Sequence, residues 1–458
     1  MTLKTKLSFS SHVAIGVMLF ALFFGAGNLI FPAELGQESG TNLLPAIIGF
    51  LITGTGLPLL GVLAIAYSGS ENLQELASRV NPVYAIFFTS LLYLTIGPFF
   101  AAPRTATVAY EVGFQSFIGE GNQQIGLFIF SLIFFAITLL ISLKPAKLVD
   151  YVGKILAPGI VILLAILLTM VVVKPMGSIE APLEAYASGS FVTGFLEGYN
   201  TMDTLASLVF AMIVIQAIRS MGVTSKQEIL RSTAKSGTVA VILLSVIYVG
   251  IAYLGATSTQ VFGIFENGGP VLSSASSYYF GAFGTVLLAI VITLACLTTA
   301  IGLVTGCAEY FQTLLPKVSY EKFVVFFATL TFVIANFGLT NIIKYAEPVL
   351  MFLYPLAIVL MLLTFLSPLF HHARSVYIST TIVTFMISIV DGFKTLSQTL
   401  EIDYFGWLKP ILAFYDSALP LYNEGLGWLL PALIVIAISG TIARVYKPVT
   451  AHAWGNRA

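Results

Sequence analysis

The segment Leu19 to Pro32, LFALFFGAGNLIFP, lies in the middle of an apolar run long enough to cross a lipid bilayer. Its centre, from Gly25 to Asn28, is a poor sequence for a continuous helix, because glycine has low helix propensity and asparagine competes for backbone hydrogen bonds. Inside hydrocarbon, however, every backbone amide and carbonyl needs a partner. The segment therefore predicts a helix interrupted where a ligand or a wet cavity completes its hydrogen bonds.

A second apolar segment has the same kind of interruption. In FVTGFLEGYNTMDTLASLVFAM, Phe191 to Met212, the break is expected from Gly198 to Met202, and Asp203 is expected to be the N-cap of the next helix. The two interruptions are 173 residues apart, from Gly25 to Gly198, and five spans separate their starting points. An odd number of spans places the second copy upside down in the membrane.

Composition agrees with a membrane protein. The chain has 458 residues, of which 58% are hydrophobic and 9% are charged, well below the 25% or so of charged residues in soluble proteins. We expect an all-α integral membrane protein with twelve transmembrane helices. The predicted spans are 12–35, 42–68, 82–110, 124–143, 149–173, 188–219, 236–257, 281–314, 321–338, 342–366, 375–393 and 426–445.

The positions of the two breaks predict an internal repeat. Residues 1–175 would form one five-helix repeat and residues 176–367 an inverted copy of it, with helices 1 and 6 broken, and residues 368–458 would add two further helices. The alternative for Gly25 and Gly27 is a small-residue face that lets another helix approach closely. The matching polar break in the second half favours a binding site.

Broken helices offer groups of both signs to a ligand. Helix N-termini present free N–H groups suited to a carboxylate, and the preceding helix ends offer carbonyls to an ammonium group or a sodium ion. A zwitterionic amino acid fits both. Asp203 is open to two interpretations, a simple helix cap or a direct contact with the ligand or ion.

A candidate cation site lies in the eighth span. Ala295, Thr298 and Thr299 are spaced so that they share one helix face, where a carbonyl and two hydroxyls provide uncharged oxygen ligands suited to sodium. The alternative is that both hydroxyls bond to a carbonyl one turn back, which is common for threonine in membrane helices.

Ionisable residues inside apolar spans are functional candidates by default. Arg104 and Glu111 share a face of the third span and either pair structurally or take part in gating, and Glu197 borders the second break. The remaining residues of this kind are Glu34, Glu309 and Glu347.

Lysine and arginine predict the orientation, because they concentrate in cytoplasmic loops. With both termini inside, sixteen of the 21 fall on the cytoplasmic side. The first span is expected to be retained, because it is too long for a signal peptide and has no small-residue cleavage site. Residues 394–425, with Trp407 and the nearby Trp428, are expected to form an outer loop lying partly in the interface. The net charge of zero argues against nucleic acid as a partner.

Three motifs in order resemble one family over essentially the whole chain. FALFFGAGNLIFPAELGQESG, GPFFAAPRTATVAYEVGF and EGYNTMDTLASLVFA are similar to the bacterial branched-chain amino acid:cation symporters, the system II carriers, which have the leucine-transporter-like fold. The resemblance implies a substrate site and a sodium site. The implied substrate-binding residues are Phe23, Phe24, Gly25, Ala26, Gly27, Asn28, Tyr199, Asn200 and Thr201. The implied sodium ligands are Ala21, Phe24, Ala295, Thr298 and Thr299.

The resemblance implies a sodium symporter of a bacterial cell membrane, with no organic cofactor, that imports leucine, isoleucine and valine by alternating access. Leu29 and Ile30 stand where well-known members of the fold have a gating arginine, so the outer gate must differ here. Alternatives are a proton-coupled carrier of the same fold, using Asp203 or Glu197, or a channel or receptor for amino acids. An intramembrane enzyme is disfavoured, because the sequence has neither an H-E-x-x-H motif nor a nucleophile elbow.

Overall fold

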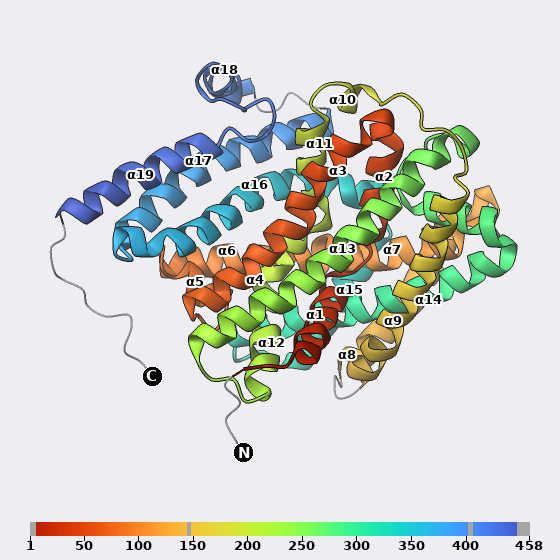
Figure 1. Cartoon of the computed structure of the whole chain (residues 1–458), viewed down its shortest axis with the longest axis horizontal. Helices are drawn as coiled ribbons and strands as arrows, with labels where there is room; N and C mark the ends of the chain where they lie inside the picture. Colours follow the sequence, from red (N-terminus) through yellow and green to blue (C-terminus); the bar gives the residue numbers. More distant parts are fainter. Residues whose placement is uncertain (1–5, 144–147, 402–405, 447–458) are drawn as a thin grey trace.

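The computed structural model describes residues 6–143, 148–401 and 406–446, with backbone only at 116, 120, 148–158, 407 and 446. Every secondary-structure element in this described part is helical (Figure 1). Eight of its helices are long and apolar enough to cross a membrane. Each of the twelve predicted spans overlaps described helices, but several are interrupted, and these interruptions position the site.

The first predicted break is present, and its limits differ slightly from the prediction. Helix α1 (Phe9–Phe23) ends at an extended residue, Phe24, and α2 (Gly27–Ser39) begins after Ala26. We call residues 24–26 the first break. The sequence placed Asn28 inside the interruption, whereas the structure places it in the first turn of α2. Pro32 lies in the second turn of α2, so the helix lacks the hydrogen bond that an amide there would make to the Asn28 carbonyl.

The second break is also present. Helix α11 (Ser190–Glu197) tightens into a short 3-10 segment, η6 (Gly198–Thr201), and α12 (Asp203–Ser220) follows. Met202 between them has a left-handed backbone with φ of 60°, which is unusual for a residue with a side chain. Met202 therefore takes the N-cap position predicted for Asp203, and Asp203 is the first residue of α12. We call residues 198–202 the second break.

The sequence did not predict a third interruption, in the span 82–110. Helix α6 (Pro82–Leu94) widens into a π-helical segment, η3 (Thr95–Phe99), in which Gly97 is non-helical, and α7 (Ala101–Gly113) begins again after Phe100. A side chain at Gly97 would collide with Cys307, whose Sγ lies 2.2 Å from where a Cβ would stand. Helix α14 therefore packs against the kink. We call residues 95–100 the third break.

The other described helices complete a closely packed bundle. In chain order they are α3 (Leu43–Leu51), α4 (Leu57–Ser68) after a π-helical turn, the short α5 (Leu73–Ala77), α8 (Gln123–Ser142), α9 (Leu148–Val173), the short α10 (Glu184–Ala187), α13 (Lys226–Phe262), α14 (Gly269–Leu314), α15 (Tyr320–Ala335) and α16 (Leu339–Leu366). Helix α14 starts earlier than the predicted position 281, where it has only a kink at Gly281.

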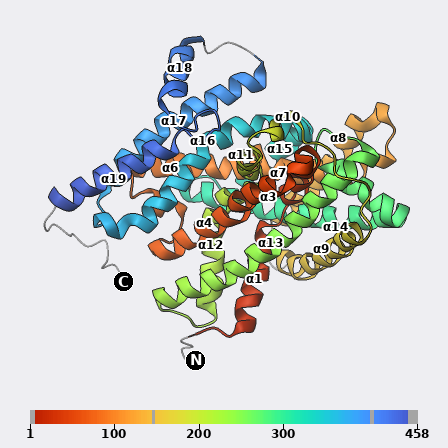
Figure 2. The same ribbon diagram turned by 45° about the horizontal axis from the view of Figure 1, so that its top comes forward.

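The C-terminal part differs from the predicted outer loop. Helix α17 (Arg374–Leu400) extends into the region expected to be loop, α18 (Lys409–Ala418) is helical, and α19 (Leu429–Tyr446) runs back beside α17 (Figures 1 and 2). Trp428 is 1% exposed, so it belongs to the interior and not to an exposed interfacial loop. Residues 402–405 of the predicted loop and the side chain of Trp407 lie outside the described part.

Two helix pairs approach unusually closely through glycine. A Cβ on Gly36 of α2 would lie 2.0 Å from the Ala252 carbonyl oxygen of α13, and one on Gly49 of α3 would lie 2.0 Å from the Phe191 carbonyl oxygen of α11. Each partner helix contributes a glycine in return, Gly255 and Gly194 respectively. Such contacts fix α2 and α11, one half of each broken helix, against neighbouring helices, because backbone packs on backbone.

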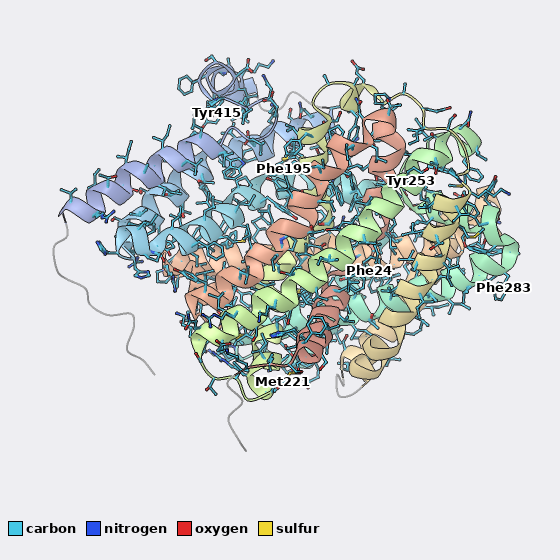
Figure 3. The ribbon with its side chains drawn as sticks, in the orientation of Figure 1. Phe24, Phe195, Met221, Tyr253, Phe283 and Tyr415 are labelled. Atoms are coloured by element: carbon cyan, nitrogen blue, oxygen red, sulfur yellow. The ribbon has the colours of Figure 1, made fainter. Side chains whose placement is uncertain are left out.

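The outside of the bundle is apolar, as a lipid environment requires. Phe283 of α14 is 77% exposed at one edge of the molecule, whereas Phe24 is buried near its middle (Figure 3). Helix α8 exposes a stripe of large apolar side chains, namely Ile125, Phe128, Ile129, Leu132, Ile133, Ile137 and Leu140. Exposed apolar faces on several long helices indicate a multi-pass membrane protein.

Candidate functional site

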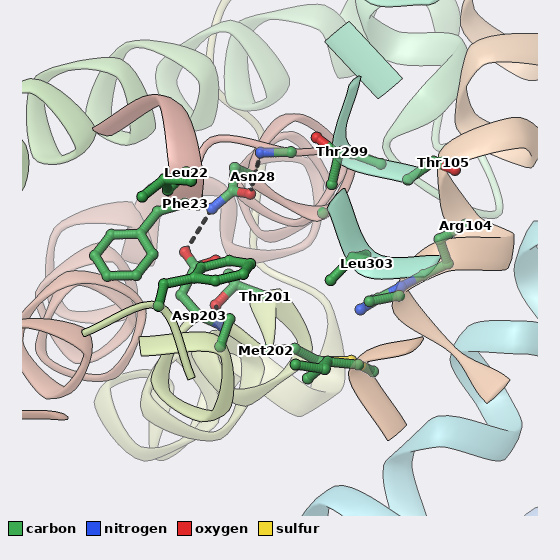
Figure 4. A pocket seen from close by; sticks show the side chains of 17 residues that line it. Leu22, Phe23, Asn28, Arg104, Thr105, Thr201, Met202, Asp203, Thr299 and Leu303 are labelled. Atoms are coloured by element: carbon green, nitrogen blue, oxygen red, sulfur yellow. Dashed lines mark hydrogen bonds between the residues drawn. The ribbon is translucent and has the colours of Figure 1, made fainter. Parts of the chain in front are cut away.

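The three breaks converge on one small cavity of about 40 Å³ (Figure 4). Each break contributes residues to its lining, and α14 closes one side. The full lining is Leu22, Phe23, Gly25, Ala26, Gly27, Asn28, Ile96, Ala101, Arg104, Thr105, Thr201, Met202, Asp203, Ala206, Phe210, Thr299 and Leu303. The volume has room for roughly three ordered waters, at 10 to 15 Å³ for each, so a larger ligand needs the helices to move apart.

Asn28 joins the first break to the second. Its Oδ1 accepts a hydrogen bond from the Gly25 amide at 2.8 Å, and its Nδ2 donates to Asp203 Oδ2 at 2.5 Å. The Asn28 Nδ2 also contacts the hydroxyl of Tyr248 on α13, and this hydroxyl donates to the same Asp203 oxygen at 3.1 Å. We call Gly25, Asn28, Asp203 and Tyr248 the Asn28 network. Buried polar networks of this kind are stable only when every member is satisfied.

The network has a consequence for the carbonyl groups of α1. In a continuous helix the Gly25 amide would donate to the carbonyl of Ala21, four residues earlier. Because it donates to Asn28 instead, the Ala21 carbonyl loses its helical partner. Phe24 does keep the helical pattern, since its amide donates to the Phe20 carbonyl at 2.7 Å. The Ala21 carbonyl, without this donor, precedes Leu22 and Phe23, which line the cavity.

Arg104 is the cation of the cavity. It is only 2% exposed, its Nη1 donates to the Asn200 carbonyl of the second break at 2.8 Å, and its guanidinium carbon lies 5.1 Å from the centre of the Phe31 ring. Its Nε has no hydrogen-bond partner. Arg104 forms no ion pair with any carboxylate of the described residues, although Asp203 and Glu197 lie within electrostatic range.

Arg104 and Glu111 do not form the pair that was one of the two alternatives for them, because each has another partner. Glu111 lies two turns further along α7, where its Oε2 accepts a hydrogen bond from Asn267 at 3.0 Å. Sharing a helix face was not sufficient, because two turns of α7, about 10.5 Å along its axis, separate the two residues. Arg104 reaches Asn200, while Glu111 meets Asn267 before α14. Neither Glu111 nor Glu197 lines the cavity. Glu197 ends α11 and accepts from the Asn200 side chain at 3.0 Å.

The two threonines of the predicted cation site take different positions. Both hydroxyls donate to the Ala295 carbonyl, at 2.8 Å from Thr298 and 3.2 Å from Thr299, which is the alternative that the sequence left open. Only Thr299 lines the cavity, where it faces Gly25: a Cβ at Gly25 would lie 3.7 Å from its Oγ1. The hydroxyl oxygens keep lone pairs while donating, so both can still coordinate a cation.

Of the nine residues predicted to bind substrate, six line the cavity and three do not. Phe24 instead stacks on Phe20 with ring centroids 5.0 Å apart, and Tyr199 stacks on Tyr354 at 3.9 Å. Asn200 contributes its carbonyl to Arg104. The six that line the cavity are Phe23, Gly25, Ala26, Gly27, Asn28 and Thr201.

Sequence reasoning missed part of the site. Tyr248 is one of two tyrosines in the long apolar helix α13, and nothing local indicates that its hydroxyl reaches Asp203. Ile96 and Ala101 line the cavity because of the third break, for which the sequence did carry a signal, the Gly97-Pro98 pair inside an apolar run. No group of three His, Cys, Asp or Glu side chains that could hold a metal occurs among the described residues.

Comparisons with known proteins agree with this architecture. Residues 8–446 match a family described as branched-chain amino acid transport protein. The chain is 44% identical to the branched-chain amino acid permease BrnQ of Bacillus subtilis, over 98% of this chain and all of that one. It is 41% identical to the branched-chain amino acid transport system 2 carrier protein of Pseudomonas aeruginosa, over 93% of this chain and 94% of that one.

Solved structures are similar in fold. The inward-facing conformation of Mhp1 matches with a TM-score of 0.59 at 13% identity, over 97% of this chain and 94% of that one. MhsT in complex with L-phenylalanine matches with a TM-score of 0.55 at 14% identity, over 96% of this chain and 99% of that one. At these identities the similarity concerns the fold alone.

Proposed function

The chain belongs to the branched-chain amino acid transport protein family, and we propose that it imports leucine, isoleucine and valine with sodium, by alternating access around the cavity between its breaks. The family consists of transport proteins and not enzymes. The observation that carries the proposal is the convergence of unpaired backbone and two opposite charges, Arg104 and Asp203, on one interior cavity.

The proposal includes two inverted five-helix repeats, residues 1–175 and 176–367, followed by two extra helices in residues 368–458. The close glycine contacts support it. In the first half, the outer part of the broken helix, α2, packs through Gly36 on Gly255 of α13. In the second half, α11 packs through Gly194 on Gly49 of α3. If α1–α2 corresponds to α11–α12, and α3–α4 corresponds to α13, the counterpart of the α11–α3 contact is that of α1 with α13, where a Cβ at Gly16 would lie 2.6 Å from the Ser236 carbonyl oxygen.

The substrate would bind with its charged end among the breaks and its aliphatic chain against apolar walls. Leu22, Phe23, Ile96, Phe210 and Leu303 supply such walls. Selectivity among the three substrates should be weak, because one methylene in an apolar pocket changes the binding free energy by only about 1 to 3 kcal/mol.

Sodium would be co-transported between α1 and α14. The proposed ligands are the Ala21 and Phe24 carbonyls, the Ala295 carbonyl and the hydroxyls of Thr298 and Thr299. The loss of the helical donor to Ala21 and the position of Thr299 beside Gly25 support this set. One sodium ion entering across 100 mV supplies about 2.3 kcal/mol, enough for roughly fifty-fold accumulation of substrate.

Proton coupling is the second candidate. It is favoured by the burial of Asp203, a carboxylate that is 3% exposed and lines the cavity. In that case Asp203 would carry the proton, and Glu197 would be the alternative carrier. We further propose that the chain spans a bacterial cell membrane twelve times with both termini in the cytoplasm.

Uptake of radiolabelled leucine into proteoliposomes tests the proposal. A sodium gradient imposed at fixed pH and fixed membrane potential should drive accumulation above the external leucine concentration, and a potassium gradient of the same size should not. Accumulation driven by a proton gradient in sodium-free buffer would replace sodium with proton coupling. Equilibration without accumulation would indicate a channel, and leucine binding without uptake would indicate a receptor.

A further inference from the structure

Arg104 occupies an electrostatically unfavourable position. It is the fourth residue of α7, a helix that begins again at Ala101 after the third break. The first turn of a helix carries a partial positive charge, which favours acidic side chains and disfavours basic ones. No side chain caps this N-terminus. A buried arginine and an uncapped helix N-terminus thus add their positive charges at the same place.

A second uncapped N-terminus faces the same cavity. Helix α2 begins at Gly27 with no side-chain cap, and both Gly27 and Ala101 line the cavity. The third N-terminus there, that of α12, differs because its first residue is an acid, Asp203. The uncapped N-termini of α2 and α7 therefore add positive potential to the cavity, while its carboxylate comes from α12, where Asp203 is held by Asn28 of α2.

The guanidinium of Arg104 is held in place, but not all of its N–H donors have a hydrogen-bond acceptor. The Asn200 carbonyl accepts from Nη1, and the Phe31 ring lies against the guanidinium, so its orientation is fixed. The Nε of Arg104 has no partner although the side chain is 2% exposed. Figure 4 shows the guanidinium pointing toward the space beside Thr201 and Met202. An unpaired buried cation is costly, and an arginine edge with free donors matches a carboxylate.

We propose that Arg104 binds the carboxylate of the transported amino acid, with the uncapped N-termini of α2 and α7 adding positive potential, and that Asp203 faces the ammonium group. The inference rests on the proposed function, since the amino acid supplies the carboxylate. Arg104 is then a specificity-determining residue, which makes the carrier select amino acids over amines and amides of the same shape.

The experiment compares leucine with leucinamide, which keeps the side chain and the amino group but lacks the carboxylate. Each ligand competes with labelled leucine for the purified full-length chain, and the dissociation constants are obtained for the unmodified chain, Arg104→Gln and Arg104→Lys. Because labelled leucine should bind only weakly to the Arg104 variants, ligand binding is also measured by the thermal stabilisation that each ligand causes. Arg374→Gln is the matched control, since Arg374 also donates to a backbone carbonyl, that of Val80, but lies outside the cavity.

The unmodified chain and Arg374→Gln should bind leucine far more tightly than leucinamide. Arg104→Gln should raise the dissociation constant for leucine by about 30-fold or more, which is the effect of losing one partner of a buried charge pair. Its affinity for leucinamide should change less than about threefold by the same reasoning. Arg104→Lys should keep a preference for leucine at reduced affinity, because lysine keeps the charge but lacks the planar fork.

Two outcomes would overturn the inference. If Arg104→Gln weakens the binding of leucine and leucinamide equally, Arg104 only supports the second break through Asn200. If the affinity for leucine is unchanged, the carboxylate binds elsewhere. If Arg104→Gln does not fold, Arg104→Lys decides between the same outcomes. Failure of the unmodified chain to bind or accumulate leucine would instead refute the proposed function.

Discussion

Replacing Asn28 by aspartate changes one NH₂ group to oxygen and reverses the polarity of the bond that joins the first two breaks. The Gly25 amide keeps its acceptor, but a carboxylate oxygen now faces Asp203 Oδ2 across 2.5 Å. Two unit charges at this distance repel each other by about 6 to 7 kcal/mol at an effective dielectric constant of 20. The pair can escape this repulsion by binding one proton, which restores a donor between the two oxygens.

Proton binding limits the expected loss of stability. Keeping a carboxyl group protonated at pH 7, when its unfolded counterpart ionises near pH 3.9, costs about 4 kcal/mol. We therefore expect Asn28→Asp to lower the free energy of unfolding by about 4 kcal/mol at pH 7. The proton is bound in the folded state and released on unfolding, so stability falls as the pH rises. The loss should change by about 1.4 kcal/mol for each pH unit above pH 4.

The assay is thermal unfolding of the purified chain between pH 5.5 and 8.5, with leucine uptake measured in parallel. The double variant Asn28→Asp/Asp203→Asn is the matched control, because it exchanges donor and acceptor and should recover most of the lost stability without the added pH dependence. Equal stability of Asn28→Asp and the unmodified chain across this range would refute the reasoning. A double variant no more stable than Asn28→Asp would do the same, since it would show that the two side chains do not depend on each other.

Three other substitutions test the rest of the site. Thr298→Ala together with Thr299→Ala should raise the sodium concentration needed for half-maximal uptake far more than it changes leucine selectivity, and unchanged sodium activation would remove this cation site. Gly27→Leu should abolish leucine uptake, because the leucine side chain would fill the space before the second break. Membrane insertion, measured by fractionation, should stay normal. Normal leucine uptake by this variant would contradict the role of the unwound backbone. Gly198→Ala should destabilise the chain by about 1 to 3 kcal/mol in thermal unfolding, because its Cβ would lie 2.0 Å from Thr53 Oγ1, and a stability equal to that of the unmodified chain would show that the helices adjust without cost.

The sequence was informative where local chemistry decides the structure. Gly25 and Asn28 have low helix propensity, and so has the run from Gly198 to Met202, so both breaks could be located to within two or three residues. The helix limits themselves follow from smaller effects. The Asn28 side chain, for example, accepts from the amide three residues before it, which ends the break and lets α2 start at Gly27.

The sequence was uninformative where the local structure depends on a residue that is distant in the chain. Gly97-Pro98 is a breaking signal, but proline is tolerated inside membrane helices, so the pair alone does not distinguish a kink from a continuous helix. The deciding factor is the approach of Cys307 on α14, 2.2 Å from where a side chain at Gly97 would begin. The possible pairing of Arg104 with Glu111 failed for a simpler geometric reason. Both residues lie on the unbroken helix α7, but an i,i+7 spacing separates them by two turns, about 10.5 Å, whereas neighbouring side chains on a helix are three or four residues apart.

The third break also explains how one cavity can present both charges. Were α6 and α7 one regular helix, the amides of Ala101 and its neighbours would bond to carbonyls four residues earlier and the positive end of the helix would lie at the membrane surface. The kink moves that end to the cavity that the first two breaks also line. Asn28 and Tyr248 donate to Oδ2 of Asp203, and Arg104 donates instead to the Asn200 carbonyl, so the two charged groups make no direct contact. The charges are therefore held apart in the cavity, and a zwitterion placed between them would compensate both.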